Sequence, residues 1–103
     1  MRLPKSFSYK GQHWQVRIEK DLQHEDGTKC DGLCDTDLRI VYIDKDISAA
    51  KKKTAFLHEL YHVMLHELHV PMNARLTEDL EDMIADAFAD MLETLFKVSW
   101  KNV

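Results

Sequence analysis

The sequence predicts an α+β domain, because the pattern of its apolar residues changes once, near residue 46. Residues 6–43 contain alternating or β-branched apolar segments, which are typical of strands, whereas later apolar positions recur every three or four residues, as in helices. A chain of 103 residues has room for one domain with one small hydrophobic core. We therefore expect a single domain over residues 1–103.

Strands are expected within residues 6–43. Residues 7–10 and 14–19 flank a Gly-Gln turn, and the second of these segments alternates apolar with polar side chains. Residues 38–43 (Leu-Arg-Ile-Val-Tyr-Ile) are β-branched and aromatic enough to form the central strand. Residues 20–36 are rich in Asp, Gly, His and Cys, which predicts a long loop.

A long helix is expected over about residues 48–69. Asp46 or Ser48 can cap its start, and it ends before Pro71 because the residue preceding a proline disfavours helical geometry. Its apolar positions follow the i, i+3, i+4 rule and are expected to face the core: Phe56, Leu57, Leu60, Val63, Met64 and Leu68.

A supporting C-terminal helix is expected over about residues 77–98. Thr77 can cap it, and acidic residues occupy its first turn, where the helix dipole favours negative charge. Its predicted core stripe has the same helical spacing and consists of Leu80, Ile84, Phe88, Met91, Leu92 and Leu95.

Composition argues against several classes of protein. The chain has 14 basic and 18 acidic residues and a net charge of −4, and its one basic run is Lys51–Lys53, so we expect no nucleic-acid partner. No segment approaches the ~20 apolar residues of a membrane helix, and the N-terminus does not resemble a signal peptide. We therefore expect a soluble cytoplasmic protein, with Cys30 and Cys34 as reduced thiols.

The motif that carries chemistry is His58-Glu59-Leu60-Tyr61-His62, which matches HExxH. Two histidines at i and i+4 lie one helical turn apart on one face, so both imidazoles can bind a single Zn²⁺ ion while the glutamate lies beside it. A chain of this composition would contain the motif by chance only about 0.02 times. His66 and His69 continue the same stripe, which also fits a solvated, histidine-rich face.

A catalytic zinc ion needs a third protein ligand. The C-terminal helix offers Glu78, Glu81, Asp82 and Asp86, and helical geometry does not choose among them. Glu81 falls on the apolar side of that helix. The other three acids share a flank with small residues that would allow close packing against the motif helix, Ala85 and Ala89.

Residues 30–96 resemble the small phage and prophage metallopeptidases of the ImmA/IrrE type, within the zincin group. The resemblance rests on the helix Thr54–Val63 with its HExxH motif, on the strand 38–43 preceded by a turn with Gly32, and on the later acidic, then alanine-rich helix. It implies a minimal zincin-like domain, in which a small antiparallel or mixed sheet packs on the HExxH helix. His58 and His62 would then be metal ligands, and Glu59 the catalytic base.

In that family, a glutamate on the later helix precedes an Asn or Asp by four residues and a Phe by six. Counting back from Phe88, Asp82 occupies the glutamate position and Asp86 the position of the residue that orients the first histidine. Aspartate is one methylene shorter than glutamate. Glu81, Glu78 and a site without a third protein ligand therefore remain alternatives.

The expected function is that of a zinc metalloendopeptidase in which Glu59 activates a zinc-bound water that attacks a peptide bond. The resemblance implies a protein or peptide substrate, such as a regulator, inside a bacterial host cell. The alternative is a catalytically inactive, zinc-binding phage or prophage interaction protein, which the short chain and Asp82 favour. The oligomeric state stays open.

Several other residues invite a role. Tyr42 or His66 could assist by stabilising the oxyanion, while Tyr61 is expected to pack. His24, Cys30 and Cys34 could form a second metal site, but they supply only three of the four ligands that a structural zinc ion needs, so ordinary thiols are expected.

Overall fold

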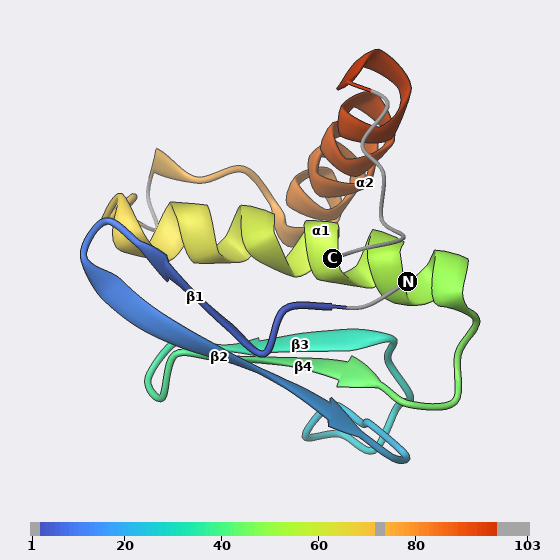
Figure 1. The fold of residues 1–103 in the computed structure, drawn as a ribbon. Helices are drawn as coiled ribbons and strands as arrows, with labels where there is room; N and C mark the ends of the chain where they lie inside the picture. The colour runs from blue at the N-terminus through green and yellow to red at the C-terminus, as the bar shows by residue number, and fades with distance from the viewer. Residues whose placement is uncertain (1–2, 72–73, 97–103) are drawn as a thin grey trace.

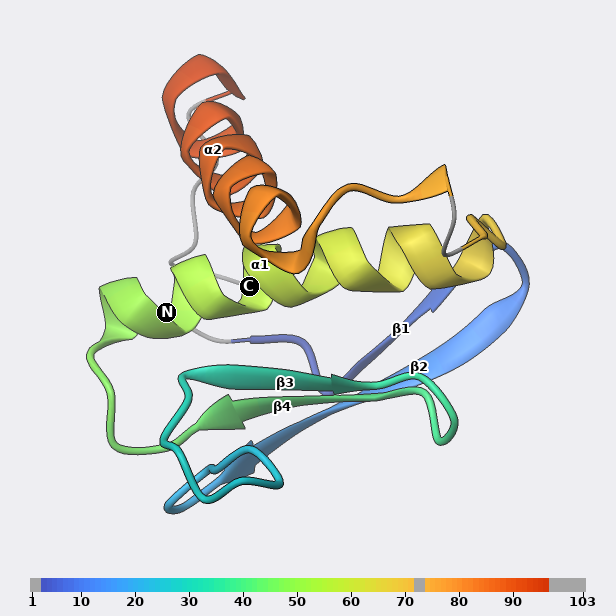
Figure 2. The ribbon, with the colours of Figure 1, turned by 180° about the vertical axis from the view of Figure 1, so that it is seen from behind.

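A computed structural model describes residues 3–71 and 74–96 and confirms the α+β class. Its elements are β1 (Ser6–Tyr9), β2 (Gln12–Glu19), β3 (Gly32–Asp35), β4 (Ile40–Asp44), α1 (Ala49–Glu67) and α2 (Glu78–Phe96). Helix α1 lies along one face of the sheet, and α2 crosses α1 on the side away from the sheet (Figures 1 and 2). The long motif helix is thus the middle of three layers.

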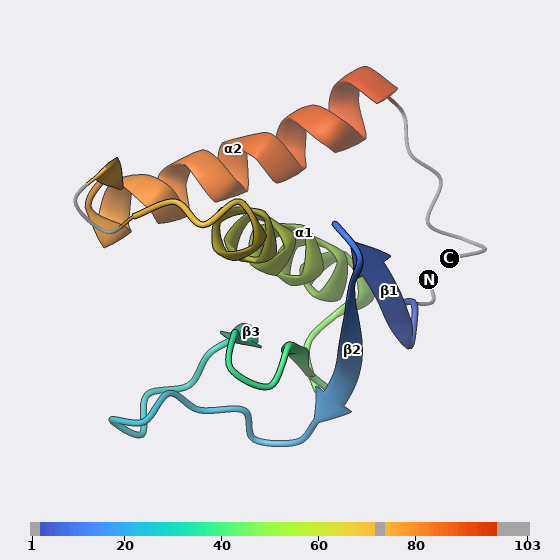
Figure 3. The ribbon, with the colours of Figure 1, turned by 90° about the vertical axis from the view of Figure 1, so that its left-hand side faces the viewer.

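The four strands form a mixed sheet in the order β1-β2-β4-β3. β1 and β2 pair antiparallel, β2 and β4 pair parallel, and β4 and β3 pair antiparallel. The strand predicted to be central, β4, does lie between two partners. β3 lies at one edge of the sheet, beneath α1 (Figure 3).

The prediction of an uninterrupted loop over residues 20–36 is wrong at its end, where β3 forms. The sequence of β3 is Gly-Leu-Cys-Asp, which contains no β-branched residue and carries little strand propensity. Its strand geometry comes from pairing with β4, in a register that sets Gly32 opposite Ile43 and Asp35 opposite Ile40. Tertiary pairing therefore creates a strand that local composition hides.

The predicted start of the central strand is two residues too early. Leu38 is 66% exposed and lies in the turn before β4, where its backbone N–H donates to the Asp35 side chain at 2.9 Å. Arg39 follows with a positive φ of 54°, which ends the turn. The first two residues of the predicted strand 38–43, Leu38 and Arg39, therefore belong to the tight turn between β3 and β4.

The hydrophobic core lies between the sheet and α1. Its most buried side chains are Trp14 from β2, Val41 and Ile43 from β4, and Phe56 and Val63 from α1, as helical and strand periodicity predict.

Helix α1 begins as predicted, because the Ser48 side chain accepts the Lys51 backbone N–H at 3.2 Å. The helix ends at Glu67. Leu68, expected in the core stripe, lies at the C-cap and is 46% exposed, so that part of the prediction is wrong.

Helix α2 begins after Thr77, whose hydroxyl accepts the Leu80 N–H at 3.4 Å, as predicted. Its predicted core stripe is wrong for the four described side chains: Leu80, Ile84, Phe88 and Met91 are 36–51% exposed. α2 instead packs on α1 through the flank that carries Ala85, which is fully buried. The side chains of Leu92 and Leu95 lie outside the described residues. None of the described helices is both long enough and apolar enough to cross a membrane.

Candidate metal centre

Helix α1 presents His58 and His62 toward α2, at the rim of its buried face. The two residues lie one turn apart, and their Nε2 atoms are 3.3 Å from each other. Both side chains are about one-fifth exposed, so they are backed by the core but reachable from the cleft.

Helix α2 adds Asp82 to this pair. Its Oδ1 lies 3.2 Å from His58 Nε2 and 3.7 Å from His62 Nε2. The short aspartate side chain reaches the histidines because Ala85, one turn further along α2, is fully buried and lets the helices approach closely. Within residues 3–71 and 74–96, these three residues form the one group of three or more His, Cys, Asp or Glu ligand atoms that meet within 4.8 Å.

The separations of these atoms fit a metal ion. A tetrahedral ion bound at ~2.0–2.1 Å requires ligand atoms that lie about 3.3 Å apart. The separations found here are 3.2, 3.3 and 3.7 Å, so one ion between the three atoms would need only small adjustments. Two imidazoles and one carboxylate are also a donor set that leaves further coordination positions for water or substrate.

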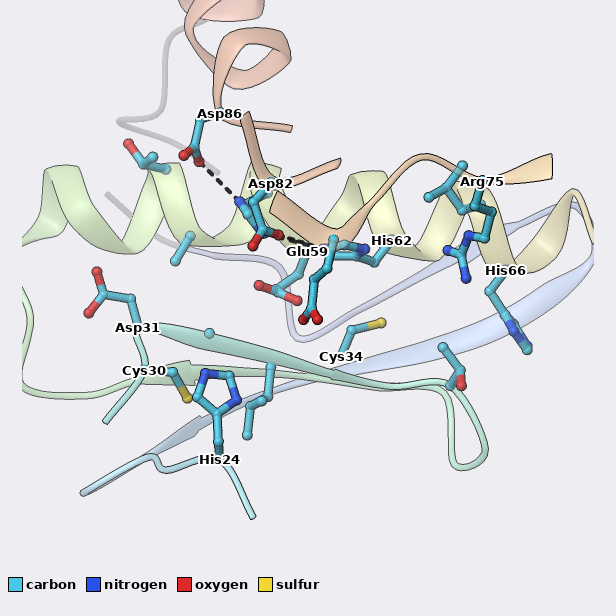
Figure 4. A pocket seen from close by; sticks show the side chains of 18 of the residues that line it. His24, Cys30, Asp31, Cys34, Glu59, His62, His66, Arg75, Asp82 and Asp86 are labelled. Carbon is cyan, nitrogen blue, oxygen red and sulfur yellow. Dashed lines mark hydrogen bonds and ion pairs between the residues drawn. The ribbon is translucent and has the colours of Figure 1, made fainter. Parts of the chain in front are cut away.

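Asp86 supports the site from one turn further along α2. Its Oδ1 lies 3.0 Å from Nδ1 of His58, the ring nitrogen that does not face the other ligand atoms (Figure 4). A carboxylate in this position fixes the tautomer and the orientation of a metal-binding imidazole.

The two histidines differ in their electrostatic environment. Burial lowers the pKa of His58, but the hydrogen bond with Asp86 and the charges of Glu59, Asp86 and Asp82 together raise it above 6.5. The pKa of His62 is lowered, first by burial and then by His58. Metal binding requires neutral imidazoles, so an ion would displace the proton that His58 attracts.

Glu59 lies beneath the histidines and faces β3. It is 7% exposed, and burial, with a smaller contribution from the charge of Asp82, raises its pKa to about 7. A Cβ at Gly32 would lie 3.2 Å from both Cγ and Oε2 of Glu59, so the glycine lets the β3 backbone approach this carboxylate. A carboxyl group whose pKa lies near 7 is suited to accept and return a proton.

The alternative third ligands lie elsewhere. Glu81 is buried, and its Oε2 lies 3.4 Å from Nε of Arg75, which explains a carboxylate on the apolar side of α2. Glu78 is exposed and lines the same cleft, but it does not belong to the group of metal-ligand candidates.

These residues line an open cleft of about 1090 Å³ between β3, α1 and the start of α2. Figure 4 shows Glu59, Cys34 and Asp82 around its middle, with Asp31 toward one end and His66 toward the other. Arg75, in the connection between the helices, also points into it. The sequence does not single out Arg75, because a single cation in a connecting segment has no distinguishing pattern.

The residues considered for a second metal site, Cys30, Cys34 and His24, do not form one in the structure. Burial raises the pKa of both thiols, that of Cys34 to about 12, so neither is poised to act as a thiolate ligand. Together with His24 they line the cleft without forming a group of metal-ligand candidates.

Tyr42 and His66, which the sequence suggested as oxyanion-stabilising residues, lie on different sides of the sheet. Tyr42 lies between two core residues of β4, so strand alternation directs its side chain to the face of the sheet away from α1. His66 lines the cleft, and its ring packs edge-on against Trp14. His69 lines the cleft as well, whereas Tyr61 lines a separate apolar pocket between β1, α1 and α2, consistent with packing.

A further buried carboxylate with two hydrogen-bond donors was not anticipated from the sequence. Glu67, near the end of α1, accepts the Trp14 indole N–H at 3.0 Å and is paired with Arg39 at 3.1 Å. Its partners are 53 and 28 positions away along the chain, so no local pattern could reveal them.

Comparison of the chain with protein-family models, with curated proteins and with solved structures finds no match.

Proposed function

We propose that this protein is a zinc-dependent metallopeptidase that hydrolyses a peptide bond in a protein substrate. The observation that carries the proposal is the convergence of His58, His62 and Asp82 on positions that suit one ion, next to the buried Glu59, whose carboxyl group faces Gly32 of β3. The resemblance of residues 30–96 to ImmA/IrrE-type peptidases favours the same function and a bacterial, phage- or prophage-encoded setting.

Zinc is the metal that this donor set favours. Neutral imidazole suits Zn²⁺, and three protein ligands with an open position are typical of its catalytic sites. When bound, zinc lowers the pKa of water and polarises carbonyl oxygens. Asp86 would keep the His58 ring in the orientation that metal binding requires.

Glu59 is the proposed general base. Its carboxylate takes a proton from the attacking water and later delivers that proton to the leaving amine. The β3 backbone approaches this carboxylate closely at Gly32, and burial raises its pKa to about 7.

The shape of the site supports a peptide substrate. β3 is at the edge of the sheet and lines the cleft beside the metal-ligand candidates. An exposed strand edge offers backbone N–H and C=O groups with which an extended peptide can pair. A peptide aligned on β3 would pass directly beneath the histidines.

A second candidate function is a metal-binding interaction protein without turnover. The exposed apolar side chains on the outer face of α2 favour it: Leu80, Met83, Ile84, Phe88 and Met91. In this case the metal ion would tie α2 to α1 and would serve stability alone.

Substitution Glu59→Gln distinguishes the two functions. The zinc-loaded wild type is expected to cleave members of an unstructured peptide library. Glu59→Gln should lower the rate by about 10²–10⁴-fold without changing zinc content, as the loss of a general base does. Glu25→Gln, in an exposed turn, is the matched control. A zinc-loaded wild type that cleaves nothing would contradict the peptidase proposal and support the interaction protein.

A further inference from the structure

Glu81 is a buried acid that the proposed chemistry does not use. It lies on α2 directly before Asp82, and its side chain is 10% exposed. A buried carboxylate is costly unless a cation or a hydrogen-bond donor compensates its charge. The cation here is Arg75, whose Nε lies 3.4 Å from Glu81 Oε2.

Arg75 extends from the connection between α1 and α2 into the catalytic cleft. Its side chain is 22% exposed and lines the cleft together with His62 and His66. Figure 4 shows the guanidinium directed toward the sheet, and in that view it is drawn between the labelled His62 and His66, which line the same cleft.

The placement matters because peptide hydrolysis creates negative charge at one oxygen. As the water oxygen bonds to the carbonyl carbon, Glu59 takes the water proton and the C=O electron pair moves onto the carbonyl oxygen. The C–N bond then breaks as this pair returns, and the amine leaves with the proton from Glu59. Donors directed at that oxygen stabilise the transition state.

We infer that Arg75 is a catalytic residue that contacts the substrate carbonyl oxygen beside His62 and stabilises the charge developing on it, and that Glu81 positions Arg75 for this task. The inference rests on the proposed function and names the oxyanion-stabilising residue of the same site. Glu81 contacts the guanidinium at Nε, the nitrogen closest to the backbone. The two terminal nitrogens form the end of the planar guanidinium, which points into the cleft (Figure 4).

The test measures binding of two metal-directed ligands to the zinc-loaded full chain by calorimetry. Phosphoramidon carries a tetrahedral phosphoryl group whose anionic oxygens stand for the oxyanion. Acetohydroxamate is a small, planar metal ligand without such a group. The variants are Arg75→Met, Arg75→Lys and Glu81→Gln, with Arg17→Met, on the exposed side of β2, as the control.

Arg75→Met is expected to weaken phosphoramidon binding by about 10–100-fold, as loss of a charge-assisted hydrogen bond does, and acetohydroxamate binding by less than about 2-fold. Glu81→Gln should have a smaller effect of the same kind, and Arg75→Lys should rescue part of the loss. Zinc content should stay at the wild-type value. With a cleavable peptide, Arg75→Met should lower kcat by about 10²-fold and leave KM within about 3-fold.

Each other result has a definite meaning. Unchanged phosphoramidon binding and kcat in Arg75→Met would overturn the inference and leave the proposed function intact. Equal weakening of both ligands together with zinc loss would also overturn it, since Arg75 would then act only on the structure. A zinc-loaded wild type that binds neither ligand and cleaves no peptide would overturn the proposed function itself.

Discussion

Glu59 and Glu67 lie about two turns apart on α1 and are almost equally buried, with 7% and 6% of their surfaces exposed. Their surroundings differ. Glu67 meets the indole N–H of Trp14 and the guanidinium of Arg39, and its pKa is lowered, first by the hydrogen bond from Arg39. Burial therefore does not prevent Glu67 from carrying its charge.

Glu59 has the opposite environment. No hydrogen bond reaches its carboxylate among the residues that the structure describes, and burial dominates the rise of its pKa to about 7. Its neighbours are the Gly32 backbone, the thiol of Cys34 and the metal-ligand candidates. Donors around a buried carboxylate therefore make it structural, whereas their absence leaves it able to exchange a proton.

The largest expected effect is on the pH dependence of stability in the metal-free protein. Because burial raises the pKa of Glu59 from 4.5 to about 7, the pH-dependent penalty on folding is small below about pH 4.5 and grows as the pH rises toward 7. Glu59→Gln should therefore stabilise the metal-free protein by about 3 kcal/mol at pH 8 and have little effect at pH 4. Urea unfolding followed by circular dichroism checks this. Equal stability of the two proteins at pH 8 would show that the Glu59 carboxylate carries its charge as readily as Glu67 does.

The second prediction concerns Glu67→Gln. This change removes the negative charge of Glu67, to which Arg39 and Trp14 both donate hydrogen bonds. It should therefore destabilise the protein by about 2 kcal/mol at pH 7. The sign of the pH dependence is opposite to that of Glu59. A lowered pKa stabilises the fold above the ordinary glutamate value of 4.5, and this stabilisation is lost as the pH falls through the lower folded-state value. The difference between wild type and variant should therefore shrink in acid, and zinc affinity should not change.

The smallest expected effect comes from Gly32→Ala. The added Cβ would lie 3.2 Å from Cγ and Oε2 of Glu59 and 3.3 Å from the Tyr42 carbonyl oxygen, so the glutamate must shift by a few tenths of an ångström. We expect a loss of roughly 1 kcal/mol or less in stability and a turnover several-fold lower. Gly32→Val should enlarge both effects. A turnover unchanged in both variants would show that β3 does not position Glu59.

What the sequence could predict follows from the range of the interactions involved. The i, i+4 spacing of His58 and His62 fixes their proximity once a helix forms, and strand and helix periodicity identify most of the core. The choice among Glu78, Glu81 and Asp82 depends on the rotation of α2 about its axis. In the structure α2 is rotated so that Ala85 is fully buried, and no local pattern determines this rotation.

Other features could not be read from the sequence for the same reason. β3 forms through pairing with β4, and Glu67 finds its partners across the fold. The exposed stripe of α2 shows a further limit, because apolar spacing predicts which residues share a face but not whether that face is covered.

The most direct test of the metal centre is a zinc titration of the metal-free protein, with calorimetry and elemental analysis giving affinity and stoichiometry. Wild type should bind one zinc ion per chain. Asp82→Ala should bind it at least about 100-fold more weakly, and Asp86→Ala about 10–100-fold more weakly, as loss of a residue that orients a ligand does. Asp90→Ala, an exposed acid on the same helix, should match wild type. A wild type that takes up no zinc, or an Asp82→Ala variant that binds it equally well, would contradict the assignment of His58, His62 and Asp82 as a metal centre.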